Sequence, residues 1–129
     1  MELVLGLKNL LKENSSDEVL AKTPIDLYRQ GNTNSPRMDN VRLNKDIATY
    51  EKNGQISVDI TLGGGISTFA TQRSGKNWWK LDAENDIPAT LDLVNDHNDH
   101  WLWKPSYNMP IEDYKESLRL VSKFFYKVS

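Results

Sequence analysis

Short apolar runs separated by turn-forming residues fill the middle of this chain, and they constrain its fold more than any other feature. In one of them Ile56, Val58 and Ile60 alternate with polar residues, which is typical of a strand with one buried face. Asn53-Gly54 precedes that run and predicts a hairpin. Further strands are predicted over Ile25 to Arg29, Ile47 to Lys52, Trp78 to Leu81, Leu91 to Val94 and Trp101 to Trp103.

Two other segments of the core have weaker patterns. The stretch from Gln30 to Lys45 is rich in Gly, Asn, Ser and Pro, and it predicts a loop long enough to have a function. After Gly63-Gly64-Gly65, the residues Ile66 to Thr71 are interpreted as the first turn or two of a helix.

The clearest single element is a C-terminal helix over residues 110–126. Its apolar residues lie on one face, Asn108 is in position to cap it, and Pro110 lies near its first turn. Leucines at helical spacing predict a helix over 2–13, and the capping-box pair Ser15 and Glu18 predicts a short helix that ends by residue 22. We therefore expect an N-terminal helical segment, 1–22, before a core of 23–129.

The length of 129 residues suits one hydrophobic core and is too short for two domains of ordinary size. Strands and helices that do not alternate regularly indicate the α+β class. The chain has no cysteine, which excludes disulfides, thiolate metal sites and cysteine nucleophiles. The apolar stretch 3–11 is interrupted by Lys8 and lacks a cleavage pattern, so neither a signal peptide nor a membrane span is expected.

The distribution of charged residues indicates which class of partner the chain can bind. The 16 basic and 18 acidic residues give a net charge of -2 and are spread along the chain, without a Lys/Arg run to neutralise a phosphate backbone. Nucleic acid is therefore not expected as a partner.

Two segments carry groups suited to an anion. Arg29 follows Tyr28 at the end of a predicted strand, where a guanidinium can hold a phosphate, although surface ion pairs are the commoner role of such arginines. The glycine run, with Ser67 and Thr68 behind it, offers backbone N–H groups for a pyrophosphate, or is simply a turn. No lysine follows the glycines, which excludes a Walker loop.

A polar cluster precedes the last predicted strand. It contains Asp96, His97, Asp99 and His100, but it lacks the His-Glu-x-x-His signature of a metal helix, and we expect a solvated turn without a metal. The four tryptophans offer rings that could stack on nicotinamide or adenine, although at least two of them should be structural. Spacing alone assigns no Ser/His/Asp set, because such groups meet in space.

Several motifs together resemble one toxin family. They are Leu27-Tyr28-Arg29, Gly64-Gly65-Ile66-Ser67-Thr68-Phe69, Asp86-Ile87-Pro88 with Leu91, and His100-Trp101 followed by Pro105 and Met109. In this order, over roughly residues 23 to 125, they are similar to the type six secretion exported effector two (Tse-two) toxins. The resemblance implies an ADP-ribosyltransferase-like core with a mixed sheet and flanking helices, delivery by a secretion machinery into a neighbouring bacterium, action in its cytoplasm, and a cognate immunity protein as partner.

The resemblance also implies NAD as the cofactor and assigns three catalytic residues. Arg29 takes the place of the first-strand arginine, Ser67 that of the serine of the second motif, and His100 that of the family's histidine. An arginine on the phosphates and hydroxyls near the ribose would lower the barrier to nicotinamide release, and a histidine can act as acid or base. The residues assigned to NAD binding are Tyr28, Gly64, Gly65, Thr68 and Trp101.

The chain departs from ordinary ADP-ribosyltransferases in one respect. The glutamate that binds a ribose hydroxyl in those enzymes has no recognisable motif here. Glu112, Asp113 and Glu116 fall on the predicted C-terminal helix, where a solvated face explains them better. Two other functions therefore stay open: a protein that sequesters a ligand or partner in the same cleft, and a small nuclease that uses His97, His100 and Arg29.

Overall fold

The computed structural model describes residues 20–129, and its central feature is a six-stranded sheet in the order β6-β7-β4-β1-β5-β9. Each pair of neighbours in this sheet is antiparallel. The predicted helices over 2–13 and 15–22 fall wholly or mostly outside the described residues. The strands are β1 (Leu27–Gln30), β4 (Ile66–Phe69), β5 (Trp78–Leu81), β6 (Leu91–His97), β7 (His100–Pro105) and β9 (Tyr126–Lys127).

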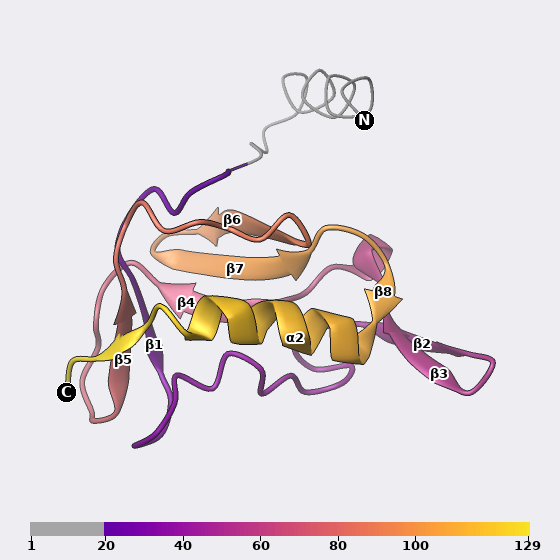
Figure 1. Cartoon of the computed structure of the whole chain (residues 1–129), viewed down its shortest axis with the longest axis horizontal. Helices are drawn as coiled ribbons and strands as arrows, with labels where there is room; N and C mark the ends of the chain where they lie inside the picture. Colours follow the sequence, from indigo (N-terminus) through magenta and orange to yellow (C-terminus); the bar gives the residue numbers. More distant parts are fainter. Residues whose placement is uncertain (1–19) are drawn as a thin grey trace.

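A smaller three-stranded sheet extends from the main body. It consists of β2 (Thr49–Lys52), β3 (Gln55–Val58) and β8 (Met109–Pro110) in the order β2-β3-β8, again antiparallel. The predicted hairpin at Asn53-Gly54 joins β2 to β3, and both turn residues have the positive φ that a tight hairpin requires. Figure 1 shows this hairpin projecting beyond α2 (Ile111–Ser122).

The core lies between one face of the six-stranded sheet and α2, which crosses the middle of the molecule in Figure 1. Tyr114 and Leu118 of α2 are fully buried, and the Tyr114 hydroxyl donates a hydrogen bond of 2.6 Å to the backbone oxygen of Trp103. Burying a side chain such as Leu118 stabilises the fold by about 1.5–3 kcal/mol. The sheet contributes Leu27, Ile66, Leu81, Leu91, Leu93 and Trp103 to this core.

The sheets, the helix and the hairpin agree with the α+β class. The long segment between β1 and β2 is irregular, as expected, but it is not merely a surface loop. Met38 is fully buried, and Val41 and Ile47 join the same core. This segment therefore closes the side of the core that α2 leaves open. Among residues 20–129 no helix is long and apolar enough to cross a membrane.

Several predicted boundaries are wrong. The residues after the glycines form strand β4, because they pair with β1 and β7, and not the start of a helix. Helix α2 ends at Ser122 and not near residue 126, because the chain beyond it forms β9 (Tyr126–Lys127), which pairs with the edge of β5. Asn108 does not cap α2; its side-chain oxygen accepts from the backbone N–H of Ile60.

The strand predicted from Ile56 to Ile60 is also wrong in its end and in which of its residues are buried. Strand β3 ends at Val58, and residues Ile60–Leu62 form a short 3-10 helix, η1. Ser57 is buried while Ile56 is exposed, because β3 lies in the small projecting sheet and only its end reaches the core. The first strand is displaced as well, to Leu27–Gln30.

Candidate functional site

The strand register divides the predicted site residues between the two faces of the main sheet. Directly paired residues in antiparallel strands share a face, and faces alternate along a strand. Tyr28 pairs with Phe69, and Phe69 pairs with His100. Ser67, two residues before Phe69, lies on the same side. We call the surface formed by Tyr28, Ser67, Phe69 and His100 the His100 face; it is opposite the face that packs against α2.

Ser67, His100 and Asp96 lie in a row on the His100 face. The Oγ atom of Ser67 is 2.7 Å from Nε2 of His100, and Nδ1 of His100 is 2.5 Å from a carboxylate oxygen of Asp96. The His100 side chain is 17% exposed. The pairing of β4 with β7 sets the first contact, since it brings together residues that are 33 positions apart in the chain.

The pairing of β6 with β7 brings Asp96 to His100. Val94 pairs with Leu102 and Asn95 with Trp101, so Asp96 follows on the same side as His100. The register shifts between Asn95 and His97, and Asp96 lies at this irregularity. Burial raises the pKa of Asp96, but the hydrogen bond and charge of His100 lower it more, and the pKa falls below its usual value. The carboxylate is therefore ionised at neutral pH and accepts the hydrogen bond from His100.

Aromatic and cationic groups surround the row. The ring of Phe69 lies 5.5 Å from that of His100, and the guanidinium carbon of Arg73 lies 3.8 Å from the centroid of the Phe69 ring. Arg73 also pairs with Asp99 at 3.2 Å, and the hydroxyl of Thr71 donates to the same carboxylate. These contacts hold the segment after β4 against the β6–β7 turn, and they place a half-exposed cation beside the site.

Arg29 lies on the opposite face of the sheet. It pairs with Trp79 and alternates with Tyr28, so its side chain points toward the α2 side. Its guanidinium donates to the backbone oxygens of Pro36, Arg37 and Ser67, at 2.9, 2.9 and 2.8 Å. Burial lowers the pKa of Arg29, although a guanidinium stays charged in proteins. Arg29 thus joins the segment 36–37 to β4, and it contacts the backbone of Ser67 but not its hydroxyl.

The remaining residues assigned to NAD binding are divided as well. Tyr28 is on the His100 face. Thr68 is fully buried on the other face, where its hydroxyl donates to the backbone oxygen of Trp101 and accepts from the indole of Trp103. Trp101 pairs with Thr68 and packs against the core.

Gly64 and Gly65 allow close backbone contacts. A Cβ on Gly65 would lie 2.4 Å from the backbone oxygen of Trp103, and one on Gly64 would lie 2.5 Å from that of Asp46. The Gly65 N–H donates to the Asp46 oxygen at 2.7 Å. These observations account for the glycines by packing, which is the turn interpretation left open by the sequence.

The cluster at the β6–β7 turn contains groups able to bind a metal. Ligand atoms of Asp96, His97 and His100 lie within 4.8 Å of one another. Asp96 and the exposed His97 also form a pair at 3.2 Å. The predicted solvated turn is thus more organised than expected, and the expectation of no metal there stays a prediction.

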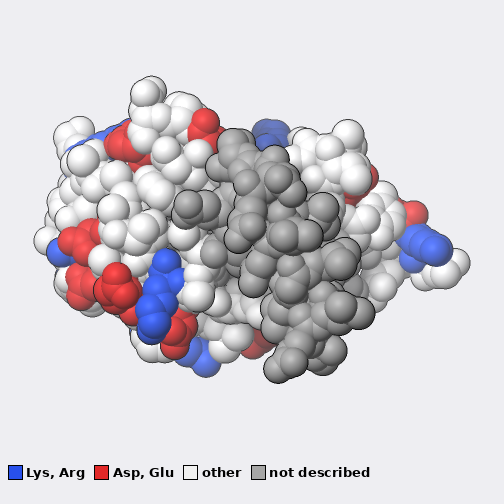
Figure 2. Space-filling model, turned by 90° about the horizontal axis from the view of Figure 1, so that it is seen from above, with Lys and Arg blue, Asp and Glu red and all other residues white. Residues whose placement is uncertain are grey.

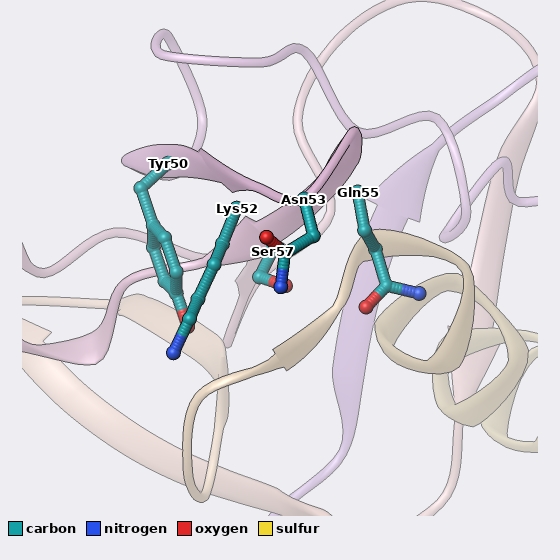
Figure 3. A pocket seen from close by; sticks show the side chains of 5 residues that line it. All are labelled: Tyr50, Lys52, Asn53, Gln55 and Ser57. Carbon is teal, nitrogen blue, oxygen red and sulfur yellow. The ribbon is translucent and has the colours of Figure 1, made fainter.

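Two shallow hollows lie away from this row. One, of about 370 Å³, is on the β2–β3 hairpin, where Figure 3 shows the side chains of Tyr50 and Lys52 extending from one strand. The other, of about 260 Å³, is lined by residues 44–48 and 62–64, which include Gly64. Neither contains Ser67 or His100. On the face in Figure 2, basic and acidic side chains lie next to one another at the lower left and at the right-hand end.

Sequence reasoning did not assign Asp96 or Arg73 to the site. Asp96 was in the polar cluster, but its contact with His100 depends on the register in which β6 pairs with β7. The turn residues Asn98 and Asp99 could have indicated a tight hairpin that places Asp96 beside His100. Arg73 lies in an irregular segment whose course depends on contacts with the β6–β7 turn.

Comparison with known proteins identifies one family. A family model described as Tse2 ADP-ribosyltransferase toxin matches residues 8–125, nearly the whole chain. No curated protein and no solved structure gives a significant match.

Proposed function

The chain belongs to the Tse2 ADP-ribosyltransferase toxin family, and from this membership we propose that it is an antibacterial effector that binds NAD and transfers ADP-ribose or hydrolyses NAD. The observation that carries the proposal within this chain is the hydrogen bond of 2.7 Å between Ser67 and His100. Both residues were assigned to catalysis from the sequence. A hydroxyl beside an imidazole at a sheet surface is suited to the ribose of NAD.

Each group on the His100 face has a proposed role. His100 orients a ribose hydroxyl or moves a proton, and Asp96 holds its ring. Tyr28 offers an aromatic ring on which nicotinamide or adenine can stack, whereas the guanidinium of Arg73 already covers the Phe69 ring. Arg73, half-exposed and on top of Phe69, is the cation that can hold a phosphate oxygen. Breaking the nicotinamide bond develops positive charge on the ribose, so fixed groups around it lower the barrier.

The proposed role of Arg29 changes with its position. The family resemblance implied a phosphate clamp, but three of its N–H donors bind backbone oxygens on the face opposite His100. We therefore propose that Arg29 positions strand β4 and does not contact the ligand. It holds the carbonyl of Ser67 and thereby keeps β4 in place beneath the Ser67 hydroxyl.

The biological context is proposed from the same family. The toxin would be delivered by a type VI secretion machinery, would act in the cytoplasm of the recipient cell, and would be neutralised in the producing cell by an immunity protein that covers the His100 face. The ADP-ribosyltransferase-like fold is part of this proposal.

Incubating the purified protein and recipient-cell extract with NAD labelled in its adenylate half tests the function. Label on protein or nucleic acid is the expected result for transfer, and release of nicotinamide without transferred label indicates hydrolysis. His100→Ala should abolish either activity, whereas Lys123→Ala, on an exposed residue after α2, should not. Intact NAD in every condition would remove the proposal, and degraded RNA beside intact NAD would favour the nuclease.

A further inference from the structure

Ser67, His100 and Asp96 have the arrangement of an activated nucleophile. A hydroxyl, a base and a group that orients the base follow one another, at 2.7 Å and 2.5 Å. Asp96 has a lowered pKa and carries no proton, so the bond to it requires a proton on Nδ1 of His100. In the tautomer with that single proton, the lone pair of Nε2 faces the Ser67 hydroxyl at 2.7 Å and can accept its proton.

The location of the row argues against a purely structural role. Ser67 and His100 are both partly exposed, so water could satisfy their polar atoms without the hydrogen bond. Strands β4 and β7 are already joined by pairing over four residues of each strand. Ser67 is partly exposed, and its hydroxyl contacts the imidazole of His100 on the face that does not pack against α2.

We propose that Ser67 is a covalent nucleophile, which accepts ADP-ribose from NAD before the group passes to water or to a target. This proposal rests on the proposed function and adds to it a named intermediate. It also supplies a route that does not require the glutamate of ordinary ADP-ribosyltransferases, because charge on the ribose is relieved by forming a bond to serine.

The bond between the anomeric carbon of the ribose and the nicotinamide nitrogen breaks, and nicotinamide leaves as a neutral molecule with the electron pair. The Oγ atom of Ser67 forms a bond to the same carbon, and its proton passes to Nε2 of His100. The imidazolium is stabilised by Asp96. In the second step the oxygen of water or of the target hydroxyl forms a bond to the anomeric carbon, and the bond from that carbon to Oγ breaks. His100 returns its proton to Oγ, and the proton of the attacking group is released to solvent as the one net proton of the reaction.

The full chain is incubated with NAD, quenched in acid at a series of times, and examined by mass spectrometry, while nicotinamide release is measured in parallel. We expect a mass gain of one ADP-ribosyl group, located on the peptide that contains Ser67. Ser67→Ala should remove the adduct and lower the rate of nicotinamide release. Ser67→Cys should accumulate the adduct, because a thioglycoside is hydrolysed slowly. Ser122→Ala removes a hydroxyl that bonds to Leu118 within α2, and it should behave as the wild type.

Asp96→Asn tests the positioning residue. An amide favours the wrong tautomer of His100, so the rate of nicotinamide release should fall by roughly 100-fold with little change in KM. A merely structural role would instead lower the melting temperature and leave the rate of the folded protein intact.

The outcomes separate this inference from the proposed function. Release of nicotinamide at equal rates by the wild type and Ser67→Ala, without an adduct on the wild type or Ser67→Cys, overturns the nucleophile and leaves the proposed function standing. If the wild type releases no nicotinamide and transfers no label, both fail. An adduct on another residue that survives in Ser67→Ala also contradicts the inference.

Discussion

Arg29 shows how much a single side chain contributes to the site without facing it. Its guanidinium binds three backbone oxygens, one of which belongs to Ser67. The segment 36–37 has no strand partner, so these hydrogen bonds replace the pairing that a strand would have there. A lysine cannot reproduce them, because its ammonium lacks the planar arrangement of the guanidinium donors.

Arg29→Ala is therefore expected to destabilise the fold. Hydrogen bonds to a charged group contribute about 1.5–3 kcal/mol, and we expect a loss of about that size in the free energy of unfolding. Urea denaturation measures it, with Lys123→Ala as the control and Arg29→Lys expected to recover only part of the loss. Full stability of Arg29→Ala, combined with weaker NAD binding, would instead restore the phosphate clamp implied by the family resemblance.

At the scale of elements, the close approach of β4 and β7 brings Ser67 to His100. Gly65 immediately precedes β4, and its missing side chain lets the backbone of Trp103 come near. The next residues continue in register, from Ile66 opposite Trp103 to Phe69 opposite His100. The Ser67 hydroxyl and the His100 ring meet because of this register. A shift at the start of β4 would therefore reach the site.

Gly65→Ala should lower both stability and activity. The new methyl group would lie 2.4 Å from the Trp103 oxygen, a backbone atom that cannot move aside alone. Overpacking of this kind costs about 1–3 kcal/mol. Thermal unfolding measures the loss, and activity of the protein that remains folded reports on the register. Ala89→Gly is the control, because it changes an exposed residue after Pro88, and its activity should persist. A Gly65→Ala protein with unchanged melting temperature and activity would show that β7 does not approach Gly65 closely.

For the whole molecule, carboxylates that are hydrogen-bonded in the folded state make stability depend on pH. Asp46 lies between β1 and β2 in the chain, and its carboxylate accepts from the backbone N–H of Arg42 at 2.7 Å and from the Arg42 guanidinium. Burial raises the pKa of Asp46, but the hydrogen bonds from Arg42 and the charge of Arg29 outweigh it, and the pKa is lowered. The pKa of Asp96 is lowered as well.

These shifts predict the stability of the molecule in acid. A carboxylate whose pKa is lower in the folded state contributes stability above its unfolded pKa, about 3.9, and loses it as the pH falls through the folded value. The contribution of these carboxylates to the free energy of unfolding should thus be nearly constant from about pH 7 to about pH 5. It should decrease below about pH 4. Urea titrations across this range measure it, and Asp46→Asn should flatten the decrease. An equally steep decrease in Asp46→Asn would assign the acid sensitivity elsewhere.

The sequence alone determined the α+β class, the hairpin at Asn53-Gly54, strand β5 and most of α2, because these depend on local periodicity and turn residues. It also identified the family, since the motifs keep their order along the chain. Tertiary structure decided the end of α2, the strand after the glycines and the face on which Arg29 lies. It also placed Asp96 beside His100, and His100 beside a serine 33 residues away. The pairing of β4 with β1 and β7, and of β9 with β5, arises from contacts between segments far apart in the chain, and local sequence patterns do not specify such contacts.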